Sequence, residues 1–461
     1  MVEDLKVRGT GGREFVSLKG RTGSSSSGVS AGGGGWTWEL VRVLALTLTG
    51  VFIGVSLRSA GNQMPLSMFW SGAGGGRGDM GCLVRDAVEF ARLHAGLISR
   101  ARGFAWGMLR ETSKPDDNVV ESPLSVDFTL GMVGLGAAGK TLDEIVSVVG
   151  GGERTFHDGL RQLRGHVQGC SEKDGPQIRM ANRLFVEQSY SLLPDFVSRT
   201  AELYGASASS IDFKGRSDES RKQINDLVGK DTAGKIKDLF PPGSIGSDSR
   251  AVLVNAIYFK GKWALPFDKR NTRNMPFKNA AGNPVDVPMM SRHDSFESAY
   301  HPELGAQFLK MRYVGGNLSM VIILPVGSTP LSQVEAKLNQ DFIQSVKFAP
   351  SMLRVFIPRF QLESSFELGD SLGQMGIREI FSKDTCNLSL MSEQADLFVS
   401  RMIHKAYIEV NEEGTEASAA TGALVSTRSL PPQFLVDRPF LFAVQEERLG
   451  LPLFVGRVSN L

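Results

Sequence analysis

The sequence predicts one large domain of the α+β class, because its strand-like runs are concentrated late in the chain and are not spaced by regular helices. Apolar runs typical of buried strands occupy residues 251–259, 320–325, 353–360, 406–410, 440–444 and 453–458. Helical spacing of apolar side chains occurs earlier, at Ala87, Phe90, Ala91, His94 and Leu97. No linker divides residues 86–461, so we expect a single domain there.

Composition indicates a globular protein and excludes some classes of partner. Hydrophobic residues make up 41% of 461 residues, which is ample for a sizeable core. Lys and Arg number 51 against 49 Asp and Glu, a net charge of +2 that gives no global field for nucleic acid, and no nucleic-acid partner is expected. The cysteines, Cys82, Cys170 and Cys386, fit neither a disulfide framework nor a metal site and allow at most one bridge.

The N-terminal segment has a different composition. Residues 1–35 are rich in Gly and Ser, and we expect this leader to be disordered. Within residues 36–61, the uncharged apolar run 43–57 is shorter than the roughly 20 residues of a membrane-spanning helix and resembles a signal-peptide core. Residues 62–85 would be a linker. We therefore expect a secreted protein; the alternatives are a membrane anchor through residues 43–57 and an intracellular chain.

Residues 134–141, GLGAAGKT, match the phosphate-binding pattern GxxxxGK[ST]. The residues before them alternate as a strand would, but they also fit a helical face, and Ser122-Pro123 is a typical helix start with serine as the cap. The best apolar strand ends at Pro325 and lacks the Asp that would hold magnesium. We favour a turn between two helices over a P-loop NTPase.

Local basic and glycosylation motifs suggest two further surface features. Helical spacing would bring together a basic stripe of Arg154, His157, Arg161 and Arg164. This stripe is a candidate site for a sulfated polysaccharide, although a solvated helix face is the favoured interpretation. Asn317 and Asn387 begin N-L-S sequences and are candidate glycosylation sites if the chain is secreted.

The stretch NEEGTEASAATGALVSTRSL, residues 411–430, combines acids, then very small side chains, then Arg-Ser. On a strand, one face would carry Thr415, Ala417, Ala419 and Thr421, and the other Glu416, Ser418, Ala420 and Gly422. A segment that stays exposed gains nothing from a face free of bulk and charge. The alternation therefore indicates a segment that inserts into an existing sheet.

From residue 86 onward the chain resembles the serpin family. The motifs NVVESPLS, ANRLF, INDLVGKDTAGKIKDLF, NAIYFKGKW, RPF and LFVGRV occur in the family's order. HKAYIEVNEEGTEASAATG resembles the hinge of an inhibitory member. The resemblance implies three β-sheets, eight or nine helices and an exposed reactive loop over residues 412–438, and it favours the helix–helix turn at residues 134–141.

The resemblance also implies where the loop is cleaved. Counting back from Gly414 and from Pro439, as the family's spacing requires, places the reactive bond between Arg428 and Ser429. A trypsin-like protease recognises such an arginine with a carboxylate in its specificity pocket. The residues expected to form the hinge are Glu412, Glu413, Gly414, Thr415, Glu416, Ala417, Ser418, Ala419, Ala420 and Thr421.

By the same resemblance, sheet opening would be controlled by Ser122, Ser125, Asn255, His404 and Trp263. Glu121 departs from the apolar residue that serpins usually carry before Ser-Pro. The implied activity is irreversible inhibition of a trypsin-like serine protease through a covalent complex, by a monomer that is not an enzyme and requires no cofactor. A non-inhibitory carrier or chaperone serpin is the alternative.

Overall fold

In a computed structural model of the chain, the structure describes residues 8–9, 14–15, 58–59, 62–63, 90–150, 153–170, 175–413 and 431–461. The chain divides into two compact units, Met1–Cys82 and Leu83–Leu461. In the first unit two short antiparallel pairs are described, β1 (Arg8–Gly9) with β2 (Glu14–Phe15) and β3 (Arg58–Ser59) with β4 (Asn62–Gln63). The predicted leader, signal-like segment and linker otherwise lie outside the described residues and stay predictions.

A five-stranded sheet has the strand order β14-β15-β8-β6-β7. Its strands are β6 (Gln177–Glu187), β7 (Ser207–Ile211), β8 (Ala251–Lys260), β14 (Phe360–Glu367) and β15 (Val399–Val410). At its centre β15 and β8 run parallel, whereas β14 and β6 pair antiparallel to them on the two sides. Both central strands are almost wholly buried; β8 is nearly all apolar, whereas β15 also carries Arg401, His404 and Lys405.

The second sheet has nine strands in the order β16-β13-β10-β11-β12-β17-β18-β5, with β9 paired to β10. The strands are β5 (Val119–Glu121), β9 (Arg273–Lys278), β10 (Pro284–His301), β11 (Ala306–Arg312), β12 (Leu318–Pro325), β13 (Ala349–Pro358), β16 (Gln433–Leu435), β17 (Phe440–Glu446) and β18 (Leu451–Val458). The long strand β10 pairs with β9 near its start, β13 in its middle and β11 at its end. Because β10 pairs with three different strands, the structure has one nine-stranded sheet where the resemblance implied two separate sheets.

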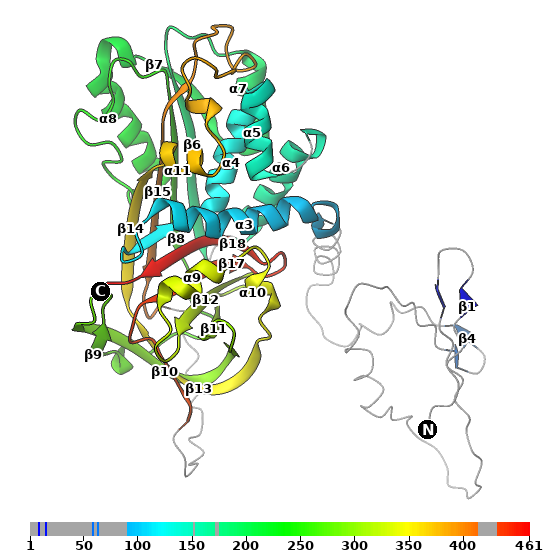
Figure 1. Ribbon diagram of the computed structural model, residues 1–461, viewed down its shortest axis with the longest axis vertical. Helices are drawn as coiled ribbons and strands as arrows, with labels where there is room; N and C mark the ends of the chain where they lie inside the picture. The colour runs from blue at the N-terminus through cyan, green and yellow to red at the C-terminus, as the bar shows by residue number, and fades with distance from the viewer. Residues whose placement is uncertain are drawn as a thin grey trace, which may run out of the picture. The chain divides into compact units, whose positions relative to one another are not determined.

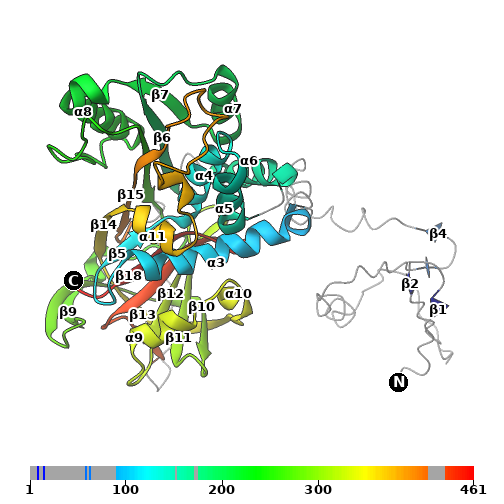
Figure 2. The same ribbon diagram turned by 45° about the horizontal axis from the view of Figure 1, so that its top comes forward.

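Nine α-helices are described from residue 95 onward: α3 (Ala95–Thr112), α4 (Pro123–Gly134), α5 (Gly139–Val149), α6 (Glu153–Gly169), α7 (Pro194–Tyr204), α8 (Phe213–Asp231), α9 (Leu331–Lys337), α10 (Phe342–Ser345) and α11 (Gly369–Gln374). Figures 1 and 2 show α3 lying along β18, with α4 to α7 grouped beyond it. Helix α4 is buried along its whole length and packs against both sheets. The α+β class is confirmed.

The predicted strands are all present, with one difference in connectivity. The run at residues 353–360 is divided at Arg359 between β13 and β14, which belong to different sheets. The Arg359 N–H donates to Pro288 O, one position beyond the Met289–Pro358 pair of the β10–β13 ladder, and the chain then enters β14 in the other sheet. A continuous apolar run therefore could not reveal the change of sheet.

Residues 134–141 span the end of α4, a turn at 135–138 and the start of α5, so the predicted turn between two helices is confirmed. The P-loop lysine, Lys140, forms an ion pair with Glu379 instead of facing a phosphate cradle. Cys386 is a buried thiol, Cys170 is buried with its Sγ 3.3 Å from His166 O, and Cys82 lies outside the described residues. Among the described residues, no helix is both long and apolar enough to span a membrane.

Gly456 marks the tightest packing within β18. A Cβ at this position would overlap the Phe442 ring and the Val119 carbonyl oxygen, because β17 and β5 flank the strand on both sides. We predict that Gly456→Ala lowers the free energy of unfolding by about 1–3 kcal/mol, measured by urea denaturation. Gly165→Ala in α6, where nothing lies within 4 Å of the new Cβ, is the control and should leave stability unchanged or slightly raised. Equal effects of the two substitutions would contradict the packing.

Candidate functional site

The parallel pair β8–β15 is held at its middle by a buried polar cluster. Asn255 and His404 are direct register partners across the two strands, and both side chains are fully buried. The Ser122 N–H donates to His404 Nε2 at 3.0 Å, so His404 carries its proton on Nδ1, which lies 2.5 Å from Asn255 Oδ1. The ring therefore bridges the end of β5 to the centre of the five-stranded sheet.

Asn255 connects this ring to α4 and to β6. Its Oδ1 also accepts from Ser125 Oγ at 2.8 Å. Its Nδ2 lies within hydrogen-bond distance of Ser125 O (3.0 Å), Thr129 Oγ1 (3.1 Å) and Asn182 Oδ1 (2.6 Å). One amide thus joins a helix and three strands, and its loss would leave the buried His404 Nδ1 without its partner.

The structure brings together four of the five predicted sheet-opening residues in this cluster, Ser122, Ser125, Asn255 and His404. Ser122 occupies the N-cap position of α4, but its hydroxyl donates to Leu453 O at 2.6 Å and does not cap the helix, contrary to the sequence prediction. Thr129 and Asn182 were missed as members. The ANRLF motif contained the signal for Asn182, whereas nothing in the sequence pointed to Thr129.

Burial also fixes the protonation state of the cluster. Desolvation lowers the pKa of His404 to about 3, and the hydrogen bond with Asn255 opposes this only in part. The imidazole is therefore neutral across the physiological range. This agrees with the acceptor role of Nε2 toward Ser122.

Trp263, the fifth predicted residue, lies apart from the cluster at the end where β15 finishes. Its indole Nε1 donates to Asn411 O at 2.8 Å, and its backbone N–H donates to Glu413 O at 3.2 Å. The indole stacks on Tyr313, with ring centroids 4.4 Å apart and planes inclined by 13°. Trp263 thus fixes the chain that leaves β15.

The first two hinge residues are tied down by charged contacts. Glu412 is 4% exposed, accepts from Thr272 Oγ1 at 2.7 Å and lies 3.7 Å from an Arg359 Nη1. Glu413 pairs with Lys260 at 3.1 Å, and this contact lowers the pKa of Glu413. The rest of the hinge, residues 414–421, and the predicted reactive bond between Arg428 and Ser429 lie outside the described residues.

The predicted basic stripe on α6 is not uniform. His157 turns inward: its Nδ1 is 2.6 Å from Tyr204 Oη, and burial lowers its pKa to about 4, so it adds no positive charge at neutral pH. Arg161 is exposed beside Asp158, at 3.6 Å, and Arg164 is half-buried with Nη2 donating to Glu202 O. The side chain of Arg154 lies outside the described residues. His157 is therefore corrected to a core contact, and polysaccharide binding stays a prediction.

The two glycosylation candidates differ in exposure. Asn387 is exposed in the segment that follows η3 (Glu379–Phe381), whereas Asn317 is half-buried and its Oδ1 accepts from Arg448. Ser319, the third residue of the Asn317 motif, is fully buried. Of the two, Asn387 has the better geometry for attachment.

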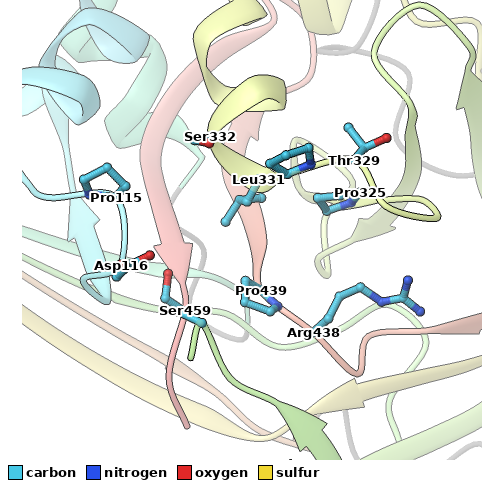
Figure 3. A pocket seen from close by; sticks show the side chains of 11 residues that line it. Pro115, Asp116, Pro325, Thr329, Leu331, Ser332, Arg438, Pro439 and Ser459 are labelled. Atoms are coloured by element: carbon cyan, nitrogen blue, oxygen red, sulfur yellow. The ribbon is translucent and has the colours of Figure 1, made fainter. Parts of the chain in front are cut away.

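A shallow pocket lies away from the cluster (Figure 3). It is lined by Pro115, Asp116, Ala280, Pro325, Thr329, Pro330, Leu331, Ser332, Arg438, Pro439 and Ser459. Its arginine, Arg438, already forms an ion pair with Asp437. None of the lining residues belongs to the cluster or to the hinge, so the pocket has no part in the site.

Comparison with known proteins agrees with this geometry. The family model described as "Serpin (serine protease inhibitor)" matches residues 99–461. Leukocyte elastase inhibitor A of Mus musculus is 37% identical over 366 residues, covering 76% of this chain and 94% of the relative. Serpin B6 of Macaca fascicularis is 38% identical over 378 residues, covering 79% and 99% of the two chains.

Solved structures of similar proteins have the same fold as the second unit of this chain. Uncleaved ovalbumin superposes with a TM-score of 0.74 at 29% identity, covering 79% of this chain and all (100%) of the other. Native protease nexin-1 with heparin gives a TM-score of 0.72 at 30% identity, with the same coverage. The family match over residues 99–461 covers most of the second unit.

Asn255 offers a direct test of the cluster. We predict that Asn255→Ala lowers the free energy of unfolding by about 3 kcal/mol or more, because it removes the partner of His404 Nδ1 and one of the two acceptors near Ser125 Oγ in a buried site. Urea denaturation at neutral pH measures the change. Asn283→Ala, at an exposed position, is the control and should change stability by less than about 0.5 kcal/mol. A neutral Asn255→Ala would contradict the cluster.

Proposed function

Because the chain belongs to the serpin family, we propose that it inhibits trypsin-like serine proteases irreversibly, by inserting residues 414–427 between β8 and β15 after cleavage at Arg428. The observation that carries the proposal is the parallel pairing of these two strands at the sheet centre, with the loop starting where β15 ends. The family description supports protease inhibition; the choice of protease rests on the sequence of the loop.

The strand directions favour insertion. A chain that leaves β15 and folds back between β15 and β8 runs antiparallel to both, so one parallel ladder is replaced by two antiparallel ones. Antiparallel pairing is slightly more stable per residue, and the sheet gains a strand. The small side chains at Thr415, Ala417 and Ala419 can enter the buried face at low steric cost.

The proposed chemistry uses the protease as the catalyst. Its serine hydroxyl adds to the Arg428 carbonyl, the peptide bond to Ser429 breaks, and the amine of Ser429 leaves with the proton that the protease histidine supplies. An ester then links the protease to Arg428. Insertion must finish before water hydrolyses that ester, and it carries the attached protease along the sheet and distorts its active site.

A second protease class has support from the relatives' names. Leukocyte elastase inhibitors are among the similar proteins, and an elastase prefers a small residue before the cleaved bond. Val425 offers such a position three residues before Arg428. The carrier alternative has weaker support, because a carrier needs no small-residue hinge.

Three accessory expectations accompany the proposal. The chain would be secreted, with a glycan at Asn387, if residues 36–61 act as a signal. A sulfated polysaccharide would accelerate inhibition through Arg154, Arg161 and Arg164, and the solved relative with heparin makes this worth testing. The free inhibitor would be a monomer.

Mixing the full chain with trypsin at equal molarity tests the reactive bond. We expect a band near the summed mass on a denaturing gel and a released fragment whose N-terminal residue is Ser429. Arg428→Leu should abolish the trypsin complex by removing the guanidinium that pairs with the protease carboxylate, whereas Thr427→Ala should keep it. If the inhibitor forms no complex with trypsin but forms one with leukocyte elastase and is cleaved after Val425, the proposed trypsin-like specificity is wrong and the target is an elastase.

A hinge substitution tests insertion separately from cleavage. Thr415→Arg should leave the rate of cleavage by trypsin nearly unchanged but convert most of the inhibitor into cleaved substrate, since burying the guanidinium slows insertion. The measurement is the number of inhibitor molecules consumed per trypsin molecule inactivated. Glu416→Arg, on the opposite face, is the matched control and should raise this number much less. An unchanged value for Thr415→Arg would contradict insertion.

A further inference from the structure

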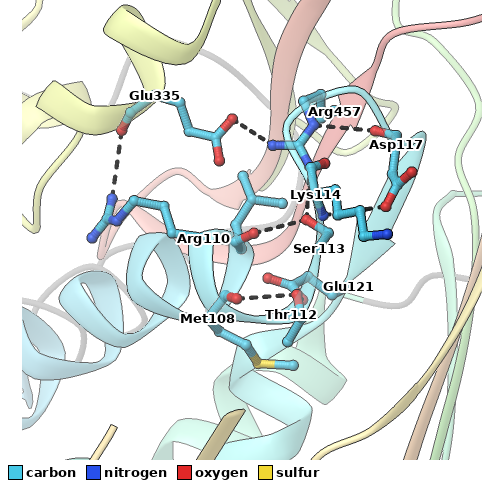
Figure 4. Close-up of polar contacts among 10 residues, drawn as sticks. Met108, Arg110, Thr112, Ser113, Lys114, Asp117, Glu121, Glu335 and Arg457 are labelled. Atoms are coloured by element: carbon cyan, nitrogen blue, oxygen red, sulfur yellow. Dashed lines mark hydrogen bonds and ion pairs between the residues drawn. The ribbon is translucent and has the colours of Figure 1, made fainter. Parts of the chain in front are cut away.

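Glu121 is a buried acid directly before the sheet-opening cluster. It ends β5, is fully buried, and precedes Ser122, whose N–H donates to His404. Figure 4 shows its carboxyl group beside the C-terminal end of α3, where Oε2 lies 2.8 Å from Thr112 Oγ1. Its other oxygen, Oε1, has no hydrogen-bond partner among the described residues.

The nearby arginine does not neutralise this carboxyl group. Arg457 is 1% exposed, and its Nη1 pairs with Glu335 Oε2 at 2.7 Å. Its Nη2 donates to Ser113 Oγ and to Lys114 O, and its Nε donates to Asp117 O (Figure 4). The guanidinium is thus engaged elsewhere, and Glu335 adds a second negative charge close to Glu121.

The hydrogen bonds of Thr112 favour the protonated acid. Thr112 Oγ1 lies 3.0 Å from Met108 O and 2.8 Å from Glu121 Oε2, and both of these oxygens are acceptors when Glu121 is ionised. A hydroxyl has one proton and cannot donate to both. If Glu121 is protonated, its O–H donates to Thr112 Oγ1 while Thr112 donates to Met108 O. Both contacts are then satisfied.

The electrostatic environment of Glu121 also favours its protonated form. Burial raises the pKa of Glu121 to about 8 and the Glu335 charge raises it further; the Arg457 charge lowers it in part, as donation from Thr112 to the ionised carboxylate would. Glu121 is therefore mostly neutral at pH 7 and becomes charged as the pH rises through about 8. His404 stays neutral throughout, because its pKa is about 3.

The strand that carries Glu121 is short and joins the two sheets. It pairs with β18 through only three residues, 119–121. The Val120 N–H donates to Ser364 Oγ of β14 at 3.0 Å, and the Ser122 N–H donates to His404 of β15. A displacement of β5 would therefore strain both contacts with the five-stranded sheet.

We propose that Glu121 is a proton-dependent lock on sheet opening: the neutral acid holds β5 and Ser122 against β15, whereas the carboxylate loosens them and makes strand insertion faster. The inference rests on the proposed function and adds a control residue to its insertion step. The charged and titratable groups that face Glu121 are Arg457 from β18, Glu335 from α9 and, through Ser122, His404 from β15.

The direction of the pH effect follows from proton binding. Since the pKa is raised from 4.5 to about 8, the folded closed form holds a proton that the unfolded chain has released in this window. The stability of the closed form therefore falls as the pH rises from 4.5 to about 8, by up to about tenfold in the equilibrium constant per pH unit. Over the same pH range, the equilibrium shifts by the same factor from the closed form toward any conformation in which Glu121 is exposed to water.

Insertion of a free peptide measures sheet opening without a protease. The full chain is incubated with an acetylated and amidated peptide of residues 414–427 between pH 6.5 and pH 9.5, and the binary complex is followed by native gel. We expect its rate of formation to rise with pH, with a midpoint near a pH of about 8, the pKa of Glu121. The rise should be about tenfold for each pKa unit by which opening lowers the pKa of Glu121.

Two substitutions and one control identify the group responsible. Glu121→Gln, whose amide can donate to Thr112 as the neutral acid does, should give a rate that no longer depends on pH, and Glu121→Leu should give the same flat profile if the glutamine variant folds poorly. Glu111→Gln, at an exposed site on α3, should keep the wild-type profile. A second buried acid, Asp127, has no hydrogen-bond partner for either oxygen within the part of the chain that the structure describes, and Asp127→Asn should also leave the profile unchanged.

The outcomes separate the lock from the function on which it rests. A flat profile in the wild type, or a wild-type profile in Glu121→Gln, would overturn the lock while leaving insertion intact. Failure of the peptide to insert at any pH would overturn the proposed insertion and the lock together.

Discussion

The pairing of β8 with β15 is the interaction on which the proposed activity depends. It is the one place in the five-stranded sheet where two long strands run parallel at the centre, and its register places Asn255 opposite His404. Parallel ladders are the weaker kind, and this one is reinforced by side chains rather than by a further strand. The two strands are therefore held together by one parallel ladder and a small number of buried polar contacts.

Burying each polar side chain of the cluster costs free energy, and this cost is offset only when all of their hydrogen bonds are formed. Asn255, Ser125, Thr129 and His404 are fully or almost fully buried, and an unpaired polar group there would be expensive. Joined together, they connect β5, α4, β6, β8 and β15. Such a network is rigid when it is complete, and the displacement of one member weakens the contacts of the others.

The sequence predicted the class, all six strand regions and four members of the cluster, because strand burial and family motifs are local signals. It could not predict that residues 353–360 divide between two sheets, since an apolar run is identical whichever sheet it enters. It placed His157 on a basic face, because helical spacing does not show which side of α6 packs against Tyr204. Glu121 was recognised as unusual, but its burial and its neighbours required the three-dimensional arrangement.

The position of β16, β17 and β18 after the loop has a consequence for how cleavage is observed. A cut within residues 414–430 breaks the covalent link between these three strands and the rest of the chain. However, β17 and β18 are buried along their entire lengths, and β17 pairs with β12 on one side and β18 on the other. The small C-terminal piece would remain as an integral part of the core. A nicked molecule should therefore elute from a gel-filtration column as one particle and reveal its two chains only when it is denatured.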